Sequence, residues 1–361
     1  MTAALPFLDL RPADADEIRE AIQRVIAHGW FILGPELDAF EQEFAAASGA
    51  RHAVGVANGT DAIALLLRAA GVRPGDAVLI PALTAGFTGL AVLAAGAEPV
   101  IVDVDPSTLT MDVASCETCM SPRVTAIVPV HLYGQPADLE ALTAFAARHS
   151  LAIVEDCCQA HLATWRGEPV GTRGAGGAFS FYPTKNLGAL GDAGAIITND
   201  PVIAERVRVM RNGGQRERHH HVQAGVNSRL DEMQAAILRA RLPRLRAETV
   251  RRRQIAGMYR QLLREAVRIP DERDPGHVYH LFPVRSSNRA ALQAHLHTRG
   301  VETLIHYPRA LCDQEVFAPY ASVPCDVARS AAREVLSLPL HPALNDADVL
   351  RVAQSVSSFT V

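Results

Sequence analysis

The segment SFYPTKNLG at residues 180–188 carries the most information about the fold and the chemistry of this chain. It begins inside an apolar run, Gly177–Tyr182, that predicts a buried strand, and glycines at positions 188, 191 and 194 follow the lysine. A lysine at the end of a core strand is unusual, because burial disfavours its charge. Lys185 therefore indicates a chemical role, since burial and nearby positive charge lower the pKa of an amine and make it a nucleophile toward an aldehyde.

A second informative segment, VEDCCQAH at residues 154–161, places Asp156 at the end of another apolar strand. A lysine that forms a Schiff base and an aspartate that holds a pyridinium nitrogen are the pair that pyridoxal phosphate requires of a protein. Asp156 alone could instead cap a helix. Gln159 could donate to the phenolic oxygen of the cofactor. Cys158 would present a small side chain to one face of its ring, and it also fits a buried small hydrophobe.

Short apolar runs alternate with helical patterns between about residues 50 and 200. The runs that we expect to be strands are Ala53–Ala57, Ala77–Pro81, Pro99–Val104, Val124–Val130, Leu151–Val154, Gly177–Tyr182 and Ala193–Thr198. The segments with helical spacing are Asp61–Ala70, Gly86–Ala95 and Ala137–His149. This alternation predicts an α/β fold with a largely parallel sheet between helices. Ligands of such sheets bind at the carboxyl ends of the strands, where Asp156 and Lys185 fall.

The chain of 361 residues is longer than one hydrophobic core usually supports, so we expect two domains. The boundaries we predict are a large cofactor-binding domain over 1–245, which includes an N-terminal arm, and a smaller α+β domain over 246–361. A long helical pattern from Arg229 to about Arg264, interrupted or kinked at Pro243, leaves the large domain. Further apolar runs at His280–Val284 and Thr303–His306 belong to the small domain.

The composition is that of an ordinary globular enzyme. Hydrophobic residues make up 48% and charged residues 20% of the chain, and the formal net charge is −4, which predicts no nucleic-acid-binding face. Arginines are densest at 251–253, on the long helical pattern, where we expect a solvated helix face. The stretch 77–97 is uncharged and long enough to cross a membrane, but Pro81, Gly86 and Gly89 divide it, so we expect core structure and no membrane span.

The N-terminal residues lack a basic region and a continuous apolar segment, so we expect no signal peptide. The chain has 6 cysteines, and Cys116-x-x-Cys119 has no second pair at matching spacing, which makes a zinc site improbable. A reducing, cytoplasmic setting is the simplest account of free thiols. His219, His220 and His221 are consecutive and cannot all face one point, so we expect no metal there and favour a loop that faces a substrate or an anion.

Residues 58–60, Asn-Gly-Thr, follow a predicted strand and open a helix. Gly59 permits close approach of the backbone, and free N–H groups at a helix start bind anions. An asparagine here could also simply cap the helix. The order of this segment relative to Asp156 and Lys185 favours a phosphate site.

These segments, in this order, resemble the DegT/DnrJ/EryC1/StrS family of sugar aminotransferases, which are pyridoxal-phosphate enzymes of fold type I. The resemblance covers almost the whole chain. Further motifs that carry it are Gly34-Pro35 with Phe40-Glu41, Gly75-Asp76, residues 130–134 (VHLYG), 225–229 (GVNSR) with 234–236 (QAA), 306–308 (HYP) and 337–339 (SLP).

The resemblance implies a homodimer that moves an amino group from L-glutamate to a keto group on a nucleotide-linked sugar. Lys185 would bind the cofactor covalently and carry protons, Asp156 would keep the ring nitrogen protonated, and Gln159 would bond the ring oxygen. Gly59, Thr60 and Ser180 would hold the phosphate, joined by Asn227 of the neighbouring subunit. Residues that we expect to face the substrate are Phe31, His161, Tyr182, His219, His220, His306 and Tyr307.

The motifs look most like those of enzymes that act on dTDP-linked 3-keto-6-deoxy sugars. A 4-keto sugar nucleotide, a keto-cyclitol or a regulatory protein that only binds the cofactor are alternatives. A branch that dehydrates its substrate has histidine in place of the lysine, which this chain keeps. The chain departs from the family pattern at Ala85, where a ring-stacking aromatic is common; either Phe87 takes this role or the stacking is absent. Other departures are His219, Leu162 and residues 309–312.

Overall fold

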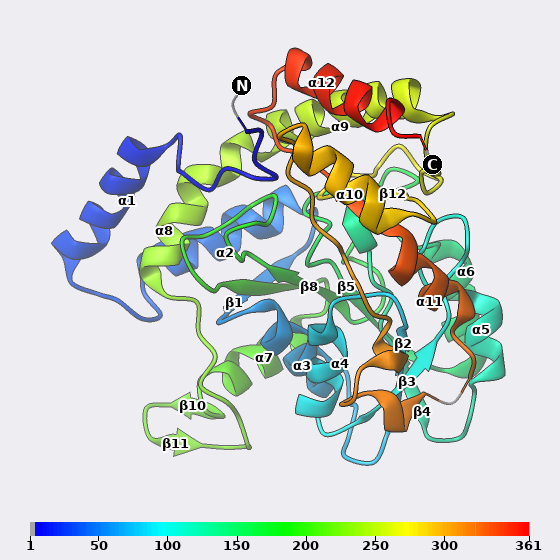
Figure 1. The fold of residues 1–361 in the computed structure, drawn as a ribbon. Coiled ribbons are helices and arrows are strands. Elements are labelled where there is room, and N and C mark those ends of the chain that lie inside the picture. Colours follow the sequence, from blue (N-terminus) through cyan, green and yellow to red (C-terminus); the bar gives the residue numbers. More distant parts are fainter. Residues whose placement is uncertain (1–3, 322, 361) are drawn as a thin grey trace.

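The computed structural model describes residues 4–321 and 323–360 and is built around a seven-stranded sheet (Figure 1). The strand order is β1-β9-β8-β5-β4-β2-β3. The strands are β1 (His52–Val56), β2 (Ala77–Pro81), β3 (Glu98–Val102), β4 (Val124–Ile127), β5 (Ala152–Asp156), β8 (Gly176–Ser180) and β9 (Gly194–Thr198). Only β9 runs antiparallel to its neighbours in this sheet. The prediction of a mostly parallel sheet is confirmed, and each strand overlaps its predicted run.

Helices cover both faces of the sheet, as the alternation of side chains along the strands shows. Ala178 and Ile196 pack in one core cluster, whereas their neighbours Phe179 and Ile197 pack in another. Successive strand residues point to opposite faces. The first cluster contains side chains of α3 (Gly59–Ala69), α4 (Gly86–Ala94) and α7 (Pro201–Arg211). The opposite face is covered by α2 (Pro35–Ala47), α5 (Val113–Thr118), α6 (Leu139–His149) and α8 (Glu232–Arg241).

Two buried carboxylates hold α2 against the rest of the molecule. Glu232, at the start of α8, accepts hydrogen bonds from the N–H groups of Gly34, Glu36 and Leu37, which begin α2 and lack helical partners. Glu41, inside α2, accepts from the Gly55 N–H at 2.8 Å and pairs with Arg211. The buried charges are thus compensated by donors.

The chain leaves the large sheet through one long, interrupted helix. α8 ends at Arg241, the 3-10 turn η2 (Leu242–Arg244) contains Pro243, and α9 (Leu245–Leu263) continues. The predicted interruption at Pro243 is therefore confirmed, and it follows from the backbone N–H that proline lacks. Among the described residues no helix is long and apolar enough to cross a membrane.

The expected solvated arginine face on this helix is wrong in part. Arg252 is buried and donates to the carbonyls of Tyr279 and Leu340. Arg241 and Arg244 both pair with Asp14, in the N-terminal segment before α1 (Ala15–His28). Spacing along a helix could not reveal these partners, because they lie far away in the sequence.

The C-terminal part has its own apolar core around an antiparallel pair, β12 (Phe282–Arg285) and β13 (Val335–Leu338). The run Thr303–His306 forms no strand and makes one bridge, between Leu304 and Ser337. The other elements there are α10 (Arg289–Thr298), η3 (Leu311–Asp313), η4 (Ala318–Tyr320), α11 (Asp326–Glu334) and α12 (Asp346–Ser357). Leu5 pairs with Val301 and packs in this second core, so this part of the N-terminal arm contacts the C-terminal part.

Short elements complete the described chain. They are η1 (Leu132–Gly134), β6 (Thr164–Trp165), β7 (Glu168–Pro169), β10 (Gln215–Glu217) and β11 (His220–His221). Figure 1 shows β10 and β11 as a hairpin at the lower left, away from the large sheet.

Candidate active site

Asp156 and Lys185 come from neighbouring strands and reach the same edge of the sheet. Asp156 is the last residue of β5 and pairs with Ala178 of β8. Because β5 and β8 are parallel, their carboxyl ends meet, and Lys185 follows the end of β8 at Ser180 by five residues. The predicted placement of both residues at the carboxyl ends of strands is confirmed.

Asp156 is buried and held by two donors. One carboxylate oxygen accepts from the Thr88 hydroxyl at 2.8 Å, and the other accepts from the Cys158 N–H at 3.1 Å. The Thr84 hydroxyl lies 3.1 Å from the Thr88 hydroxyl and shares a hydrogen bond with it. Thr88 is not among the site residues predicted from the sequence. Thr84 precedes α4 and Thr88 lies within it, so no helical spacing joins the two, and Asp156 lies 68 residues further along the chain.

Lys185 is partly buried, and its Nζ makes no hydrogen bond to another residue of the described chain. Burial lowers the pKa of its amine, while the nearby Cys158 and Asp156 act in the opposite direction. The sequence predicted that nearby positive charge would also lower this pKa. The structure shows no such contribution, and desolvation alone lowers the pKa. An amine whose pKa is lowered, close to a buried carboxylate, is suited to attack a carbonyl and to move protons.

Three histidines in the surroundings of Lys185 are held in the neutral form. Burial, aided by the charge of Lys185, lowers the pKa of His161 to about 3 and of His306 to about 4, and it lowers the pKa of His280 well below its usual value. The His161 Nε2–H donates to the Ser180 carbonyl at 2.9 Å, between the rings of Phe179 and Phe181. His161 is fully buried, so in this structure it presents no surface to a substrate.

Gly59 lies in close contact with the strand ends. A Cβ at this position would come within 2.8 Å of both the Cys158 sulfur and the Ser180 Cβ, so only glycine fits between them. Asn58 caps α3 by accepting from the Asp61 N–H at 2.8 Å, which leaves the N–H groups of Gly59 and Thr60 without a partner among the described residues. Free N–H groups at a helix start beside a serine form an anion site.

Gln159 connects the site to the C-terminal part. Its side-chain oxygen accepts from the Tyr133 N–H at 2.6 Å, and its amide nitrogen donates to the Tyr307 hydroxyl at 2.9 Å. The Tyr133 hydroxyl in turn donates to the His306 carbonyl at 2.5 Å. His306 itself shares a hydrogen bond of 3.0 Å with the Ser337 hydroxyl. His306 and Tyr307, predicted to face the substrate, are thus tied to the site through Gln159.

The remaining predicted residues are exposed at the surface, and the exposed group of Phe31, Phe87, Tyr182 and the β10–β11 hairpin is called the rim here. Phe31, Phe87 and Tyr182 are 50%, 65% and 50% exposed. His219 and His220 lie on the β10–β11 hairpin and are exposed, as are Arg216 and Arg218. Of these residues, Tyr182 contacts the site through its backbone, because its N–H donates to the Ser180 hydroxyl at 3.3 Å and its carbonyl accepts from the Lys185 N–H at 2.8 Å.

Asn227 is also exposed, in the segment between the β10–β11 hairpin and α8. Its neighbour Ser228 is buried and accepts from the Ala57 N–H of the same protomer, directly before the start of α3. Its predicted role across a subunit interface remains a prediction.

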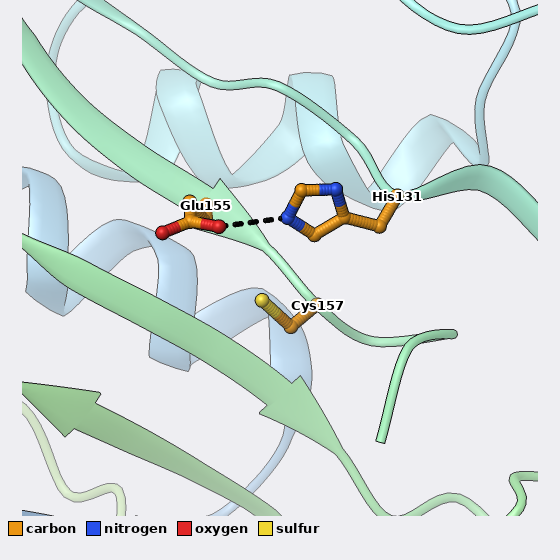
Figure 2. Close-up of side chains that lie close together, drawn as sticks. All are labelled: His131, Glu155 and Cys157. Atoms are coloured by element: carbon orange, nitrogen blue, oxygen red, sulfur yellow. Dashed lines mark hydrogen bonds and ion pairs between the residues drawn. The ribbon is translucent and has the colours of Figure 1, made fainter. Parts of the chain in front are cut away.

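One group of potential metal ligands, His131, Glu155 and Cys157, occurs within the described part of the chain, and it lies behind the site (Figure 2). Glu155 precedes Asp156 on β5 and therefore points to the opposite face of the sheet. Its carboxylate accepts from His131 Nε2 at 2.9 Å and from the N–H groups of Gly171 and Arg173.

The hydrogen bonds of this group leave few ligand atoms free for a metal ion. His131 Nδ1 accepts from the Ala137 N–H at 3.0 Å, so the ring proton is on Nε2. This N–H donates to the Glu155 carboxylate. Burial and the charges of Glu155 and Asp156 raise the pKa of the Cys157 thiol well above its usual value, which keeps it protonated. Metal binding requires a thiolate and a free imidazole nitrogen, so the group fits a structural network better.

The donor set at the sheet edge fits pyridoxal phosphate. The close contact at Gly59 leaves free helical N–H groups beside Ser180 for a phosphate. Asp156 is a buried carboxylate with two hydrogen-bond donors and forms no ion pair with another described residue, so it could pair with a protonated ring nitrogen. Lys185 offers an amine whose pKa is lowered by burial.

Comparison with known proteins agrees with this chemistry. A family model described as the DegT/DnrJ/EryC1/StrS aminotransferase family matches residues 12–357. A dTDP-3-amino-3,4,6-trideoxy-alpha-D-glucose transaminase of Streptomyces venezuelae is 46% identical, over 99% of this chain and 97% of that protein. A UDP-2-acetamido-2-deoxy-3-oxo-D-glucuronate aminotransferase of Pseudomonas aeruginosa is 39% identical, over 98% and 100% of the two chains.

The fold is also shared with solved structures. NtdA of Bacillus subtilis, crystallised with the bound cofactor PMP, superposes with a TM-score of 0.92 at 31% identity. The match covers 99% of this chain and 85% of that one. The sheet and its surrounding helices are therefore those of an aminotransferase.

Proposed function

This chain belongs to the DegT/DnrJ/EryC1/StrS aminotransferase family and is a sugar nucleotide aminotransferase, and we propose that it uses pyridoxal phosphate to move an amino group from L-glutamate to a 3-keto sugar. The observation that carries the proposal is the meeting of Lys185 and Asp156 at one edge of the sheet. A lysine with a lowered pKa beside a buried carboxylate is the pair that this cofactor requires.

The roles of the cofactor residues follow from their surroundings. When bound, pyridoxal phosphate supplies an electron-withdrawing ring that stabilises negative charge on the substrate carbon. The N–H groups of Gly59 and Thr60 and the Ser180 hydroxyl would hold its phosphate. Asp156, fixed by Thr88, would keep the ring nitrogen protonated.

Proton movement is assigned to one side chain. Lys185 Nζ would carry protons between the substrate carbon and C4′ of the cofactor, in one direction with L-glutamate and in the other with the keto sugar. Its side chain has no hydrogen bond to the described residues, which leaves it able to turn between these two carbons. The three histidines around Lys185 are neutral, so they do not repel the ammonium form of its side chain.

We propose a homodimer in which each active site is completed by the partner. Apolar side chains are exposed beside the site, Phe31 and Phe87 among them, and Trp30 is 58% exposed. Such an exposed apolar rim is typical of an interface. The hairpin, with Arg216, Arg218 and the adjacent histidines, would reach the diphosphate of the sugar nucleotide in the neighbouring site, and Asn227 would reach the cofactor phosphate.

The 3-keto position is supported by the relatives, whereas the nucleotide is less constrained. The names of both relatives described above place the reacting group at carbon 3, and one substrate is linked to dTDP and the other to UDP. We propose a dTDP-linked 3-keto-6-deoxy sugar, as the sequence motifs indicate. A 4-keto sugar nucleotide and a keto-cyclitol are the competing acceptors. The reducing, cytoplasmic setting expected from the free cysteines is part of the same proposal.

The test is amino transfer with a panel of acceptors. Purified protein with pyridoxal phosphate and L-glutamate would be offered a dTDP-linked 3-keto sugar, a dTDP-linked 4-keto sugar, a UDP-linked 3-keto sugar and a keto-cyclitol. We expect mass spectrometry to detect an amino sugar only from the 3-keto compounds, with the highest kcat/KM for the dTDP one. Amination of the 4-keto sugar or the cyclitol in preference would contradict the assignment.

A further inference from the structure

The segment His277–Leu281, called here the crossing segment, joins α9 to β12 and is held from two sides. From η1, which follows β4, the carbonyls of Gly134 and Tyr133 accept from the N–H groups of Val278 and Leu281 at 3.0 and 3.3 Å. From α9, Arg253 donates to the His277 carbonyl at 2.9 Å, and Arg252 donates to that of Tyr279 at 3.3 Å.

The backbone of the crossing segment is strained at its centre. Tyr279 has φ of +46°, in the left-handed region that is unfavourable for a residue with a side chain. Its ring stacks on His277 with centroids 3.7 Å apart, and its hydroxyl pairs with Glu272. A strained conformation that is fixed by so many contacts commonly marks a functional position.

A third connection leads from the crossing segment to the residue next to Lys185. The side chain of Asn186 is buried and donates from Nδ2 to the Val278 carbonyl at 3.1 Å. Its Oδ1 lies 3.2 Å from His280 Nδ1. Because a carbonyl can only accept, Nδ2 must face Val278, so Oδ1 accepts and His280 Nδ1 carries the proton. Burial lowers the pKa of His280 well below its usual value, and no carboxylate of the described residues pairs with it.

These contacts matter because the side chain of the catalytic lysine makes few of its own. The Lys185 Nζ has no hydrogen bond within the described chain, so its position depends on its backbone. That backbone is held by the Lys185 N–H, which donates to the Tyr182 carbonyl at 2.8 Å, and by the buried side chain of Asn186 directly after it.

We propose that Asn186 and His280 are positioning residues for the aminotransferase reaction. Their hydrogen bond fastens the peptide that carries Lys185 to the crossing segment, and so to α9 and the C-terminal part. The inference rests on the proposed function, which it deepens. Catalytic groups must be held within fractions of an ångström, and a small displacement of the reacting amine costs much of the rate.

The test compares two substitutions of His280. His280→Asn keeps an N–H close to the place of Nδ1, whereas His280→Leu removes the donor. We expect His280→Leu to lower kcat by about 10- to 100-fold. The KM values for L-glutamate and the sugar nucleotide should change little, because neither residue touches them. His280→Asn should restore most of the lost kcat. Equal losses in both variants, or no loss in either, would overturn the proposal.

A second measurement does not depend on activity. Hydrogen–deuterium exchange of the protein without cofactor should show faster exchange of peptides covering 183–189 in His280→Leu than in His280→Asn. Exchange in β1, β4 and α6 should stay unchanged. A uniform increase over the whole chain would show a general loss of stability and would refute a positioning role.

Asn186→Asp gives an independent check should His280→Leu fail to fold. It keeps the size and Oδ1 of the side chain but replaces the donor to Val278 with an oxygen. We expect Asn186→Asp to lose as much kcat as His280→Leu and to show the same faster exchange over 183–189. Wild-type kcat and exchange would refute a positioning role for Asn186 and His280. If the wild-type protein transfers no amino group at all, the proposed function fails, while the exchange experiment still decides whether the pair holds the lysine segment.

Discussion

The buried edge of the sheet and the exposed rim around it are built in opposite ways. At the edge, Asp156, Gln159 and Gly59 each have close partners within the same chain. On the rim, Phe87 and the β10–β11 hairpin are largely exposed. In terms of our proposal, the residues that would act on the ring of the cofactor are positioned within one chain, whereas the residues that would bind the sugar nucleotide are exposed in that chain and would act in a dimer.

The largest effect is expected at the edge, from Lys185→Ala. This change removes both the amine that binds the cofactor and the group that moves the proton, so turnover should fall by at least about 10⁴-fold. The fold should survive, since Nζ has no hydrogen bond with the described residues to lose. Steady-state kinetics and circular dichroism would check both statements. Retained transamination would remove Lys185 from the mechanism.

A smaller but severe effect is expected from Asp156→Asn. The amide keeps the shape and can still accept from Thr88, but it has no charge to hold a protonated ring nitrogen. We expect kcat to fall by about 10² to 10³-fold, comparable to the loss of a preorganised charged group. Thr88→Val, which removes only the supporting donor, serves as a milder comparison. Near-normal rates of Asp156→Asn would contradict its assigned role.

The rim should respond differently, and the double variant Arg216→Ala with Arg218→Ala tests this. Both side chains are exposed on the hairpin, so stability should be unchanged. We expect the KM for the sugar nucleotide to rise by about tenfold, because charge-assisted contacts to the diphosphate are lost. The KM for L-glutamate should stay the same. Equal effects on both substrates would show that the hairpin does not contact the nucleotide.

The smallest effect is a dependence of stability on pH that comes from the buried edge. His161 and His306 have folded-state pKa values of about 3 and about 4, below the usual value of 6.5. The unfolded chain therefore binds more protons below pH 6.5, and stability should fall as the pH decreases from about 6.5 toward 4. His161→Gln should flatten the decrease in Tm over this window. An unchanged profile would mean that His161 is not buried in solution.

The sequence allowed the sheet, the lysine and the aspartate to be predicted, because each depends on local patterns. Apolar runs specify strands, and the ends of parallel strands meet at one edge. Thr88, Asn186 and His280 were not predicted, since their partners lie far away in the sequence. For the same reason the arginines of α8 and α9 were expected to face solvent, although Arg252 is buried. Patterns reveal which face is apolar, but they do not reveal which distant polar group meets another.

The visible absorption spectrum of the purified protein, recorded before and after addition of L-glutamate, tests the central claim most directly. We expect the band of the cofactor bound to Lys185, and its replacement by the band of the amine form when glutamate is added. Lys185→Ala should lack the first band. A wild-type protein that shows no band after addition of pyridoxal phosphate, or a band that glutamate leaves unchanged, would contradict the account.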